Sequence, residues 1–396
     1  MNNRTDYVRP KFYLKSVSSS GAVIKNQASN IYKEGFYPAY SASGQDVWLP
    51  DYMYEGNALI ISAVGARCGK VFLASGKWGL CANTHVLFVN EEKSRIKFLY
   101  YILNNENWWK KGGSAQPFVL VNDSLNQEIY LPGLAQHDLI VSKIDTVVNK
   151  LDRLIEIEER QLRNLQDFKQ SLICKAITKG LNKNVVLKDS GIEWIGEIPN
   201  HWNKVYLSSI FKEHKNKNTN LVCTNLLSLS YGKIKQKNIN TSEGLLPENF
   251  EGYNIVEKED IVLRLTDLQN DHTSLRVGIS NETGIITSAY VTLRKTTEAI
   301  IPKFYYYLLH TYDIEKGFYG MGAGVRQVLN FDGLKRLELL LCSVEEQQEI
   351  VDYLDKKCVE IEKLVNIKQQ KIEKLQEYKK SLIYEYVTGK REVKEG

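Results

Sequence analysis

Two stretches of the chain carry apolar residues at alternating spacings of three and four. This spacing predicts two long amphipathic helices that pack through the seam of a coiled coil. In the first stretch the seam residues are Ile140, Ile144, Leu151, Leu154, Leu165, Phe168 and Leu172. In the second stretch they are Ile350, Leu354, Ile361, Leu364, Leu375, Tyr378 and Leu382.

Both stretches have clear end signals. Pro132-Gly133 precedes the first and Gly180 follows it, while Ser343 with Glu346 forms a capping-box pattern before the second and Gly389 follows that one. Each helix is then about 40 residues long, or about 60 Å. A single helix of this length with one apolar stripe is not stable alone in water, so each needs a partner.

The two stretches are copies of one another. LQDFKQSLI, which starts at Leu165, recurs as LQEYKKSLI from Leu375, and the offset of 210 residues extends over the whole stretch. We therefore expect the copies to pair antiparallel about a pseudo-twofold axis. At the middle of the seam stand Glu158 and Gln161 in the first copy and Lys368 and Lys371 in the second. We expect looser packing and solvated charge there, with a Glu158–Lys368 pairing as the alternative.

The segments before each helix are also duplicated, more faintly. GLCANTHVLF from Gly79 aligns with GIITSAYVTL from Gly284, and KFLYYIL from Lys97 aligns with KFYYYLL from Lys303. The short β-branched runs ALIIS, HVLFV, IVLRL and YVTLR predict strands, and the tyrosine-rich runs have helical spacing and predict core helices. The predicted fold class is α+β, with two mixed α/β domains (residues 1–132 and 181–340) joined by two antiparallel coiled-coil helices (133–180 and 341–396). Divergent surfaces on this shared framework favour one task on two targets, and drift after duplication is the alternative.

Composition places the chain among globular proteins. It has 396 residues, 43% of them hydrophobic and 25% charged. No apolar run is long enough to span a membrane and the N-terminus lacks the pattern of a secretory signal, so we expect a cytoplasmic protein. The net charge of +5 is small for a protein that binds nucleic acid unaided. The six cysteines form no C-x-x-C pair, which argues against a zinc site or a disulfide framework.

Catalytic signatures are missing from the sequence. GARCGKV from Gly65 resembles a phosphate-binding loop, but the spacing between the glycines is one residue short, and Val71 follows the lysine where Ser or Thr would be needed. The Asn/Asp-Pro-Pro-aromatic loop of adenine methyltransferases does not occur, nor does H-E-x-x-H or G-x-S-x-G. We therefore expect no catalytic residue, metal or cofactor in this chain.

Several motifs together resemble the specificity subunit of type I restriction–modification systems, which act in prokaryotic defence. DSGIEWIGEIPNHW (Asp189 to Trp202) is similar to the opening of that family's second target-recognition domain. Further matches are Glu346-Gln347 with Ile350, the helix ends at Ser171 and Ser381, and GVRQ from Gly324 to Gln327. The first copy departs from the pattern: it has Gln136-His137 at the helix start, and it lacks the opening motif, beginning near Tyr13-Leu14.

The resemblance implies a non-catalytic subunit that recognises double-stranded DNA. Each recognition domain would read one half of a bipartite asymmetric site, and the helices would set the spacer. Two modification subunits, which bind S-adenosylmethionine and methylate adenine at N6, would dock on the helices and domains. Two restriction subunits, ATP-dependent translocases and nucleases, are an optional addition. The alternatives are a coiled-coil scaffold whose two domains bind proteins rather than DNA, and a DNA-modifying enzyme with a fused specificity unit.

Contacts with DNA would come from polar and basic side chains on loops at one face of each domain. In the first domain the candidates are Tyr40, Ser41, Ser43, Arg67, Lys70, Lys77, His85, Lys111 and Gln116. In the second they are Tyr231, Lys233, Lys235, Arg264, Thr266, Arg276, Ser288, Tyr290, Arg326 and Gln327. For each residue, surface solvation or a turn-stabilising hydrogen bond is the alternative.

Overall fold

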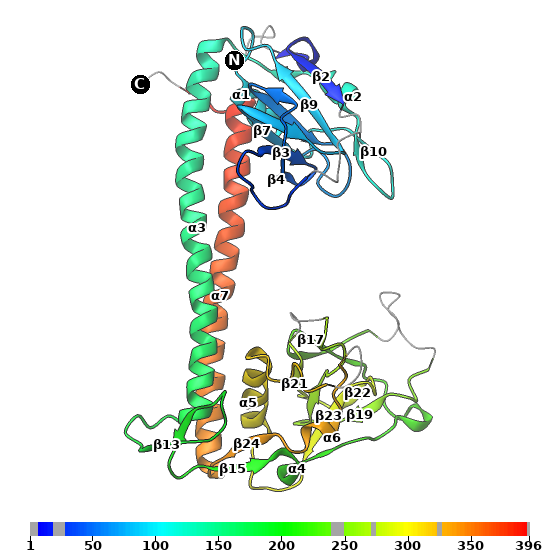
Figure 1. Ribbon diagram of the computed structural model, residues 1–396, viewed down its shortest axis with the longest axis vertical. Helices are drawn as coiled ribbons and strands as arrows, with labels where there is room; N and C mark the ends of the chain where they lie inside the picture. The colour runs from blue at the N-terminus through cyan, green and yellow to red at the C-terminus, as the bar shows by residue number, and fades with distance from the viewer. Residues whose placement is uncertain (1–6, 19–27, 239–248, 271–274, 323–326, 394–396) are drawn as a thin grey trace. The chain divides into compact units, whose positions relative to one another are not determined.

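The computed structural model describes residues 7–18, 28–238, 249–270, 275–322 and 327–393 (Figure 1). The chain divides into two compact units. Unit 1 comprises residues 1–159 and 369–396, and unit 2 comprises residues 160–368. Each unit contains one globular head and a segment of both long helices, which confirms the predicted fold class. Within the described ranges, no helix is long and apolar enough to cross a membrane.

Head 1, the part of unit 1 before residue 133, contains two four-stranded sheets. The first sheet is antiparallel and has the order β2-β9-β6-β7. Its strands are β2 (Leu14–Ser18), β6 (Ala58–Ser62), β7 (Val71–Ala74) and β9 (Thr84–Val89). The second sheet has the order β4-β3-β8-β5. Its strands are β3 (Tyr37–Ser41), β4 (Gly44–Leu49), β5 (Tyr54–Glu55) and β8 (Lys77–Leu80).

Strand β6 is buried on both faces, which explains its unbroken apolar sequence. Ile60 packs with Trp78 in one cluster, whereas Ile61 packs with Phe98 of helix α1 (Ile96–Leu103) in another. Shorter elements complete the head: β1 (Tyr7–Val8) paired with β12 (Ile129–Tyr130), β10 (Lys111–Gly112) paired with β11 (Phe118–Val119), the 3-10 turn Pro10–Phe12, and α2 (Val121–Leu125).

Head 2, residues 181–343 of unit 2, repeats this plan. Its four-stranded antiparallel sheet has the order β16-β23-β20-β21, the same succession as in head 1. Its strands are β16 (Phe211–Glu213), β20 (Ile261–Leu263), β21 (Val277–Ile279) and β23 (Val291–Lys295). The remaining strand pairs are β13 (Leu187–Asp189) with β14 (Glu197–Pro199), β15 (Asn203–Tyr206) with β24 (Glu338–Leu341), β17 (Leu227–Ser230) with β18 (Lys233–Gln236), and β19 (Asn254–Val256) with β22 (Gly284–Ile286).

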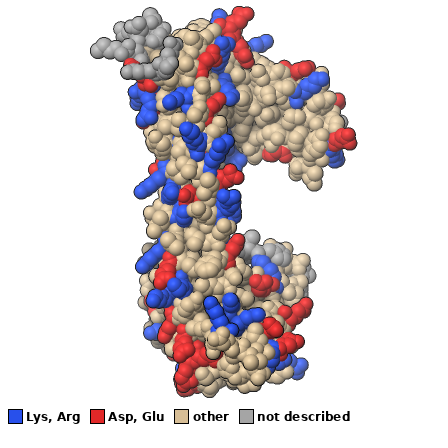
Figure 2. Space-filling model, turned by 90° about the vertical axis from the view of Figure 1, so that its left-hand side faces the viewer, with Lys and Arg blue, Asp and Glu red and all other residues tan. Residues whose placement is uncertain are grey.

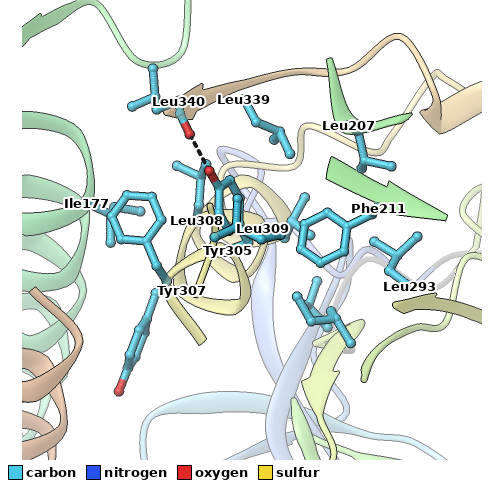
Figure 3. Packing of buried hydrophobic residues seen from close by; sticks show 14 of the residues in the cluster. Ile177, Leu207, Phe211, Leu293, Tyr305, Tyr307, Leu308, Leu309, Leu339 and Leu340 are labelled. Carbon is cyan, nitrogen blue, oxygen red and sulfur yellow. Dashed lines mark hydrogen bonds between the residues drawn. The ribbon is translucent and has the colours of Figure 1, made fainter. Parts of the chain in front are cut away.

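Helix α5 (Pro302–Ile314) forms the centre of the unit 2 core. Tyr305 is fully buried beside Phe211, and its hydroxyl donates to the Leu340 carbonyl at 3.0 Å (Figure 3). The tyrosine-rich run is therefore core, as its helical spacing predicted. The other short helices of the head are α4 (Leu207–Ile210), the 3-10 turn Thr219–Leu221, and α6 (Phe331–Leu334).

The two heads differ at their openings. Strand β1 pairs with β12 in head 1, just as β15 pairs with β24 in head 2. The Asp189–Trp202 motif adds the hairpin β13–β14 and the fully buried Trp202, whose Nε1 donates to Glu346 Oε2 at 3.0 Å. In the described part of head 1 no such hairpin precedes β1, and the shared framework is kept.

The long helices are α3 (Leu134–Lys179) and α7 (Val344–Val387). They end at Gly180 and Gly389, which have φ angles of 70° and 69° and act as left-handed caps. The capping box at Ser343 is only half present. Ser343 Oγ accepts from the Glu346 amide at 3.2 Å, but the Glu346 carboxylate bonds to Trp202 and His201 instead.

In each unit the helix segments pair antiparallel. In unit 1 Lys379 Nζ lies 2.5 Å from Asp152, and in unit 2 Lys169 Nζ lies 2.7 Å from Glu362. The offset of 210 residues relates these two ion pairs, lysine to lysine and acid to acid. Of the predicted seam residues, seven are buried and three half-buried: Ile140, Ile144, Leu151, Ile350, Leu354, Ile361 and Leu382, then Leu165, Leu172 and Leu375.

Four predicted seam residues are instead exposed, and their assignment was wrong. Leu154 and Leu364 are each 48% exposed, Phe168 is 56% exposed and Tyr378 is 51% exposed. The seam passes beside them because its positions follow a regular 3-4 spacing. Its buried positions in α3 are Val148, Leu151, Ile155 and Glu158. In α7 they are Cys358, Ile361 and Ile372, with the half-buried Val365 and Lys368 between them.

The middle of the seam is polar, and the expectation of solvated charge was wrong for Glu158. Glu158 is only 6% exposed, and its Oε1 lies 2.7 Å from Lys371 Nζ. In unit 2 the ammonium of Lys368 donates to Gln161. The repeat relates position 158 to 368 and position 161 to 371. The Glu158–Lys371 and Lys368–Gln161 contacts therefore occupy equivalent positions, one in each unit.

Candidate nucleic-acid interface

Three loops meet at one end of the sheets in head 1. Arg67 Nη1 donates to the Ser43 carbonyl at 3.3 Å, and the Gly65 amide donates to the Pro117 carbonyl at 2.8 Å. These contacts join residues 41–44, 64–70 and 111–118 into what we call the first loop end. The predicted residues that it contains are Ser41, Ser43, Arg67, Lys70, Lys111 and Gln116, of which all but Ser41 and Lys70 are exposed.

Local hydrogen bonds hold the first loop end in shape. Ser41 Oγ donates to Asp46 at 2.8 Å and accepts from the Ser43 amide at 3.0 Å, so this hydroxyl is occupied by turn formation. Lys70 follows the tight turn at Gly69 and places its ammonium 5.7 Å from the centre of the Phe72 ring. The pseudo-phosphate-loop sequence is therefore a turn between β6 and β7 that presents a lysine.

Three predicted residues of head 1 are less suited to contact DNA. The Tyr40 hydroxyl donates to the Leu73 carbonyl at 3.2 Å, and burial raises the pKa of this tyrosine. His85 is half-buried on β9, and burial lowers its pKa. Lys77 is exposed, but β8 runs parallel to β3, which places Lys77 at the opposite end of the sheet from Ser41. The first loop end does not include it.

Head 2 has an equivalent second loop end, formed by residues 231–232, 264–268, 287–290 and 327. Leu263 pairs with both Val277 and Val291, so the residues that follow β20 and precede β21 and β23 lie together. The Leu268 amide donates to the Gln327 carbonyl at 3.3 Å, which brings Gln327 to the same place. The predicted residues here are Tyr231, Arg264, Thr266, Ser288, Tyr290 and Gln327; Arg326 lies outside the described residues.

Exposure varies within the second loop end. Tyr231 is 82% exposed, because it occupies a left-handed position (φ 49°) at the two-residue turn between β17 and β18. Ser288 is exposed, while Tyr290 packs partly on the cluster around Leu229. Gln327 is half-buried, and its Oε1 accepts from the Gly320 amide at 3.3 Å. Tyr231 and Ser288 are thus the most accessible of the predicted side chains here.

Two lysines of β18 have different surroundings. Lys233 Nζ lies 3.4 Å from Glu362 of α7, which is also the partner of Lys169. Lys233 therefore ties the hairpin to the long helix of its own unit. Lys235 is exposed and pairs across the hairpin with Ser228 of β17.

Arg276 is a correction to the predicted contact set, because it is fully buried. Its Nη1 donates to the carbonyls of Arg264 at 3.1 Å and Thr266 at 2.9 Å, and its guanidinium lies 5.3 Å from the Tyr319 ring centre. Its own amide donates to Asp313 at 2.6 Å. Arg276 therefore stabilises the second loop end through these hydrogen bonds, and its side chain is not accessible from the surface.

One polar residue next to the first loop end escaped the sequence analysis. Asn83 is exposed, has a φ of 66°, and its carbonyl accepts from the Ala63 amide at 2.8 Å. The signal that could have found it is an asparagine directly before a strand, since asparagine tolerates the left-handed region. Among the described residues, no cluster of His, Cys, Asp and Glu is suited to hold a metal ion.

Charge on the long helices is mixed. Figure 2 shows Lys and Arg side chains along their visible face, interspersed with Asp and Glu. This mixture agrees with the small net charge of +5.

Comparison with known proteins gives consistent results. Residues 11–165 match the family model described as the type I restriction modification DNA specificity domain. Over 391 residues the chain is 25% identical to the type I restriction enzyme MjaVIII specificity subunit of Methanocaldococcus jannaschii, covering 91% of this chain and 87% of that protein. It is 23% identical over 168 residues to the EcoDI specificity subunit of Escherichia coli, covering 42% of this chain and 36% of that protein.

The fold is shared with a solved structure that concerns complex assembly and conformational transition of the type I R-M system. One chain of that structure matches with a TM-score of 0.64 and 14% identity, covering 96% of this chain and 98% of the other. The similarity spans both heads and both long helices. Over nearly its whole length the chain is thus similar to type I restriction enzyme specificity subunits, and residues 11–165 match their DNA specificity domain.

Proposed function

We propose that this chain recognises DNA for a type I restriction–modification complex, each head reading one half of a bipartite asymmetric site. The observation that carries the proposal is that two heads with one sheet order present different residues at equivalent loop ends. Identical heads would read a symmetric site, and unrelated heads would need no common framework. The chain supplies recognition and no chemical step.

Within this proposal the loop-end residues divide by chemistry. Arg67, Lys70 and Lys111 carry the charge to bind phosphates, which position the protein without reading sequence. Gln116 has the donor and acceptor pair that matches an adenine edge in the major groove. In head 2, Gln327 would read bases, as would Arg326, which lies outside the described residues, and Tyr231 and Lys235 would add contacts.

The antiparallel helices would set the spacer between half-sites, about one helical turn or ~34 Å apart. Seven residues inserted at equivalent points of both helices keep the seam in register and lengthen the pair by about 10 Å. The gap should then grow by about three base pairs, since DNA rises ~3.4 Å per base pair. An unchanged gap in the methylated motif would exclude the spacer role.

Modification subunits, each with its own S-adenosylmethionine, would dock on two apolar patches of the helices. In unit 1 the exposed Leu154, Ile157 and Tyr378 lie near one level, which the Asp152–Lys379 ion pair fixes. The repeat places Leu364, Ile367 and Phe168 in unit 2 at the equivalent positions, and these are exposed too. Two equal patches suit two copies of one partner.

The docking proposal has a simple titration test. Leu364→Ala with Ile367→Ala should remove one of the two modification subunits, because only the unit 2 patch is lost. The matched control is Asn366→Ala, an exposed polar position between them. Mass measurement of the assembled complex gives the number bound. Two subunits bound with unchanged affinity would refute docking at this patch.

The test of the function itself is replacement of residues 190–335 with the corresponding head of another family member. One half of the recognised site should change, and the other half and the gap should remain. Methylation-sensitive sequencing of the host genome reads both halves and the gap together. Changes in both halves would refute modular reading. A methylation pattern that is unaffected by deletion of the gene would instead favour the protein-binding scaffold.

A further inference from the structure

Each head is attached to a long helix of its own unit through one aspartate. In unit 1 this is Asp145 of α3. Its Oδ2 lies 2.8 Å from Lys97 Nζ, and its Oδ1 accepts from the Tyr101 hydroxyl at 2.5 Å. Lys97 and Tyr101 both belong to α1, the helix that packs on β6 and β7. One carboxylate therefore holds two side chains of the head helix, four residues apart.

Unit 2 has the same arrangement atom for atom. Asp355 of α7 places Oδ2 2.6 Å from Lys303 Nζ, and its Oδ1 accepts from the Tyr307 hydroxyl at 2.7 Å. Lys303 and Tyr307 belong to α5, which packs on β21. We call each group of aspartate, lysine and tyrosine a clamp.

A second attachment point precedes each clamp. In unit 1 the Nδ1 of His137 accepts from the Arg95 amide at 3.5 Å, and in unit 2 the Oε1 of Gln347 accepts from the Ile301 amide at 2.7 Å. Histidine and glutamine thus perform one task with different chemistry. This explains why the first copy departs from the family pattern at this position.

Together, the two attachment points fix the direction of the head helix relative to the long helix of its unit. They stand eight residues apart on the long helix, a separation of about 12 Å. A helix held at two such points cannot swivel about either one. Because the head helix carries the sheet, its direction also sets the direction of the loop end. Burial raises the pKa of Tyr101 and Tyr307, so both hydroxyls stay protonated and donate to the carboxylates.

Both units contain the clamp, whereas a neighbouring contact occurs in only one of them. Next to the first clamp, Arg95 forms a forked ion pair with Asp138 at 3.0 Å. The corresponding residues of unit 2 are Ile301 and Gln348, which cannot form it. Partly exposed ion pairs contribute little to stability by themselves. Retention of the clamp in both divergent copies therefore indicates a geometric role.

We propose that Asp145 and Asp355 are positioning residues: each clamp sets the angle at which a head meets its long helix, and so limits which spacer lengths the protein accepts. The inference rests on the proposed function, because it assigns the gap between half-sites to the clamps as well as to helix length. The clamps touch no DNA. Their loss should alter gap selectivity and leave both half-site sequences unchanged.

The test uses the full chain assembled with its modification subunits, and DNA duplexes whose gap differs from the natural one by one base pair. Asp145→Asn/Asp355→Asn keeps the side-chain volume and removes the charge that holds lysine and tyrosine. Methylation of the wrong-gap duplexes relative to the natural one should rise about tenfold, the factor that corresponds to loss of one charge-assisted hydrogen bond. Preference within each half-site should stay as in the unaltered chain.

Two further variants complete the design. Asp167→Asn makes the same change at an exposed position of α3 and should leave gap selectivity unchanged. Tyr101→Phe/Tyr307→Phe removes only the hydroxyls and should relax the gap to a smaller extent, so it replaces the aspartate variant if that chain fails to fold. Unchanged gap selectivity in the folded clamp variants would overturn the inference. Failure of the unaltered complex to methylate any bipartite site would overturn the proposed function instead.

Discussion

Lys70 in head 1 and Arg276 in head 2 occupy the same place in the framework. Each immediately precedes the edge strand of its sheet, at Val71 of β7 and Val277 of β21. Lys70 is half-exposed with its ammonium over a ring, whereas Arg276 is fully buried and donates to two loop carbonyls. The difference teaches that equivalent basic residues can lie at the surface in one head and support the loops in the other.

A large loss of stability should follow from Arg276→Met. Methionine fills the space but leaves the carbonyls of Arg264 and Thr266 without their buried donor. Each such group costs about 1–3 kcal/mol, so we expect a loss of about 3 kcal/mol in the free energy of unfolding. Urea unfolding followed by hydrogen exchange should place this loss in unit 2. DNA recognition should fail only in the half-site that head 2 reads.

Lys70→Met is the matching substitution in head 1. Stability should change by less than about 0.5 kcal/mol, as for other surface substitutions. DNA affinity should fall, and the slope of log affinity against log salt should decrease by about one if Lys70 binds a phosphate. A stability loss like that of Arg276→Met, or an unaltered salt slope, would show that the two positions do not differ as argued.

The polar layer of the seam offers a second comparison between the copies. Glu158→Lys would put an ammonium in a site that is 6% exposed, beside Lys371. Breaking a buried ion pair in this way costs about 3–5 kcal/mol, and the exposed end of Lys371 favours the lower limit. Lys368→Glu in the other copy replaces a half-buried lysine and removes its contact with Gln161, which should cost about 1 kcal/mol or less.

Urea midpoints of the two variants and of the combined variant Glu158→Lys/Lys371→Glu check this asymmetry. The combined variant restores opposite charges and should recover most of the loss from Glu158→Lys. Equal losses of stability from Glu158→Lys and Lys368→Glu would mean that the two equivalent seam positions contribute equally to stability. If the charge exchange did not recover stability, loss of the Glu158–Lys371 ion pair would not be the cause of the destabilisation by Glu158→Lys.

Much of the fold could be predicted from periodicity. The ends of α3 and α7, the strands β6, β9, β20 and β23, and the duplication all follow from spacing and turn residues. The seam was less predictable because more apolar residues lie along the helices than one seam can bury. Phe168 fits a helical stripe as well as Ile155 does, and only the partner helix decides which of them is covered.

The candidate site could be predicted only as a set of loops. Arg276 and Arg67 are both basic residues near strand ends, yet one is buried and the other exposed. Whether each side chain is buried depends on how the neighbouring loops fold over it. For Arg276 this involves Tyr319, which lies far away in sequence. Lys77 likewise shares the chemistry of Lys70, but strand direction places it at the other end of the sheet.

A pH-dependent effect is expected at the attachment points His137 and Gln347. Burial lowers the pKa of His137 to about 4, a shift that nearby Arg95 assists and Asp138 opposes. The unfolded chain has an ordinary histidine pKa near 6.5, so it binds more protons than the folded chain between about pH 6.5 and 4. Stability from this residue is complete above pH 6.5 and declines as the pH falls, by up to about 1.4 kcal/mol per pH unit.

His137→Gln installs the residue of the second copy and should remove this dependence. Urea midpoints at pH 7 should be similar for the two proteins, and below pH 6.5 the unaltered chain should lose stability faster. His310 of unit 2 has its pKa lowered in the same direction, but it is present in both proteins and cancels in the difference. Parallel stability curves from pH 7 to 5 would show that His137 keeps its proton affinity on folding. A curve that diverges below pH 6.5 would instead mean that one head is attached through a titratable contact and the other is not, a difference in acid sensitivity between two otherwise equivalent attachment points.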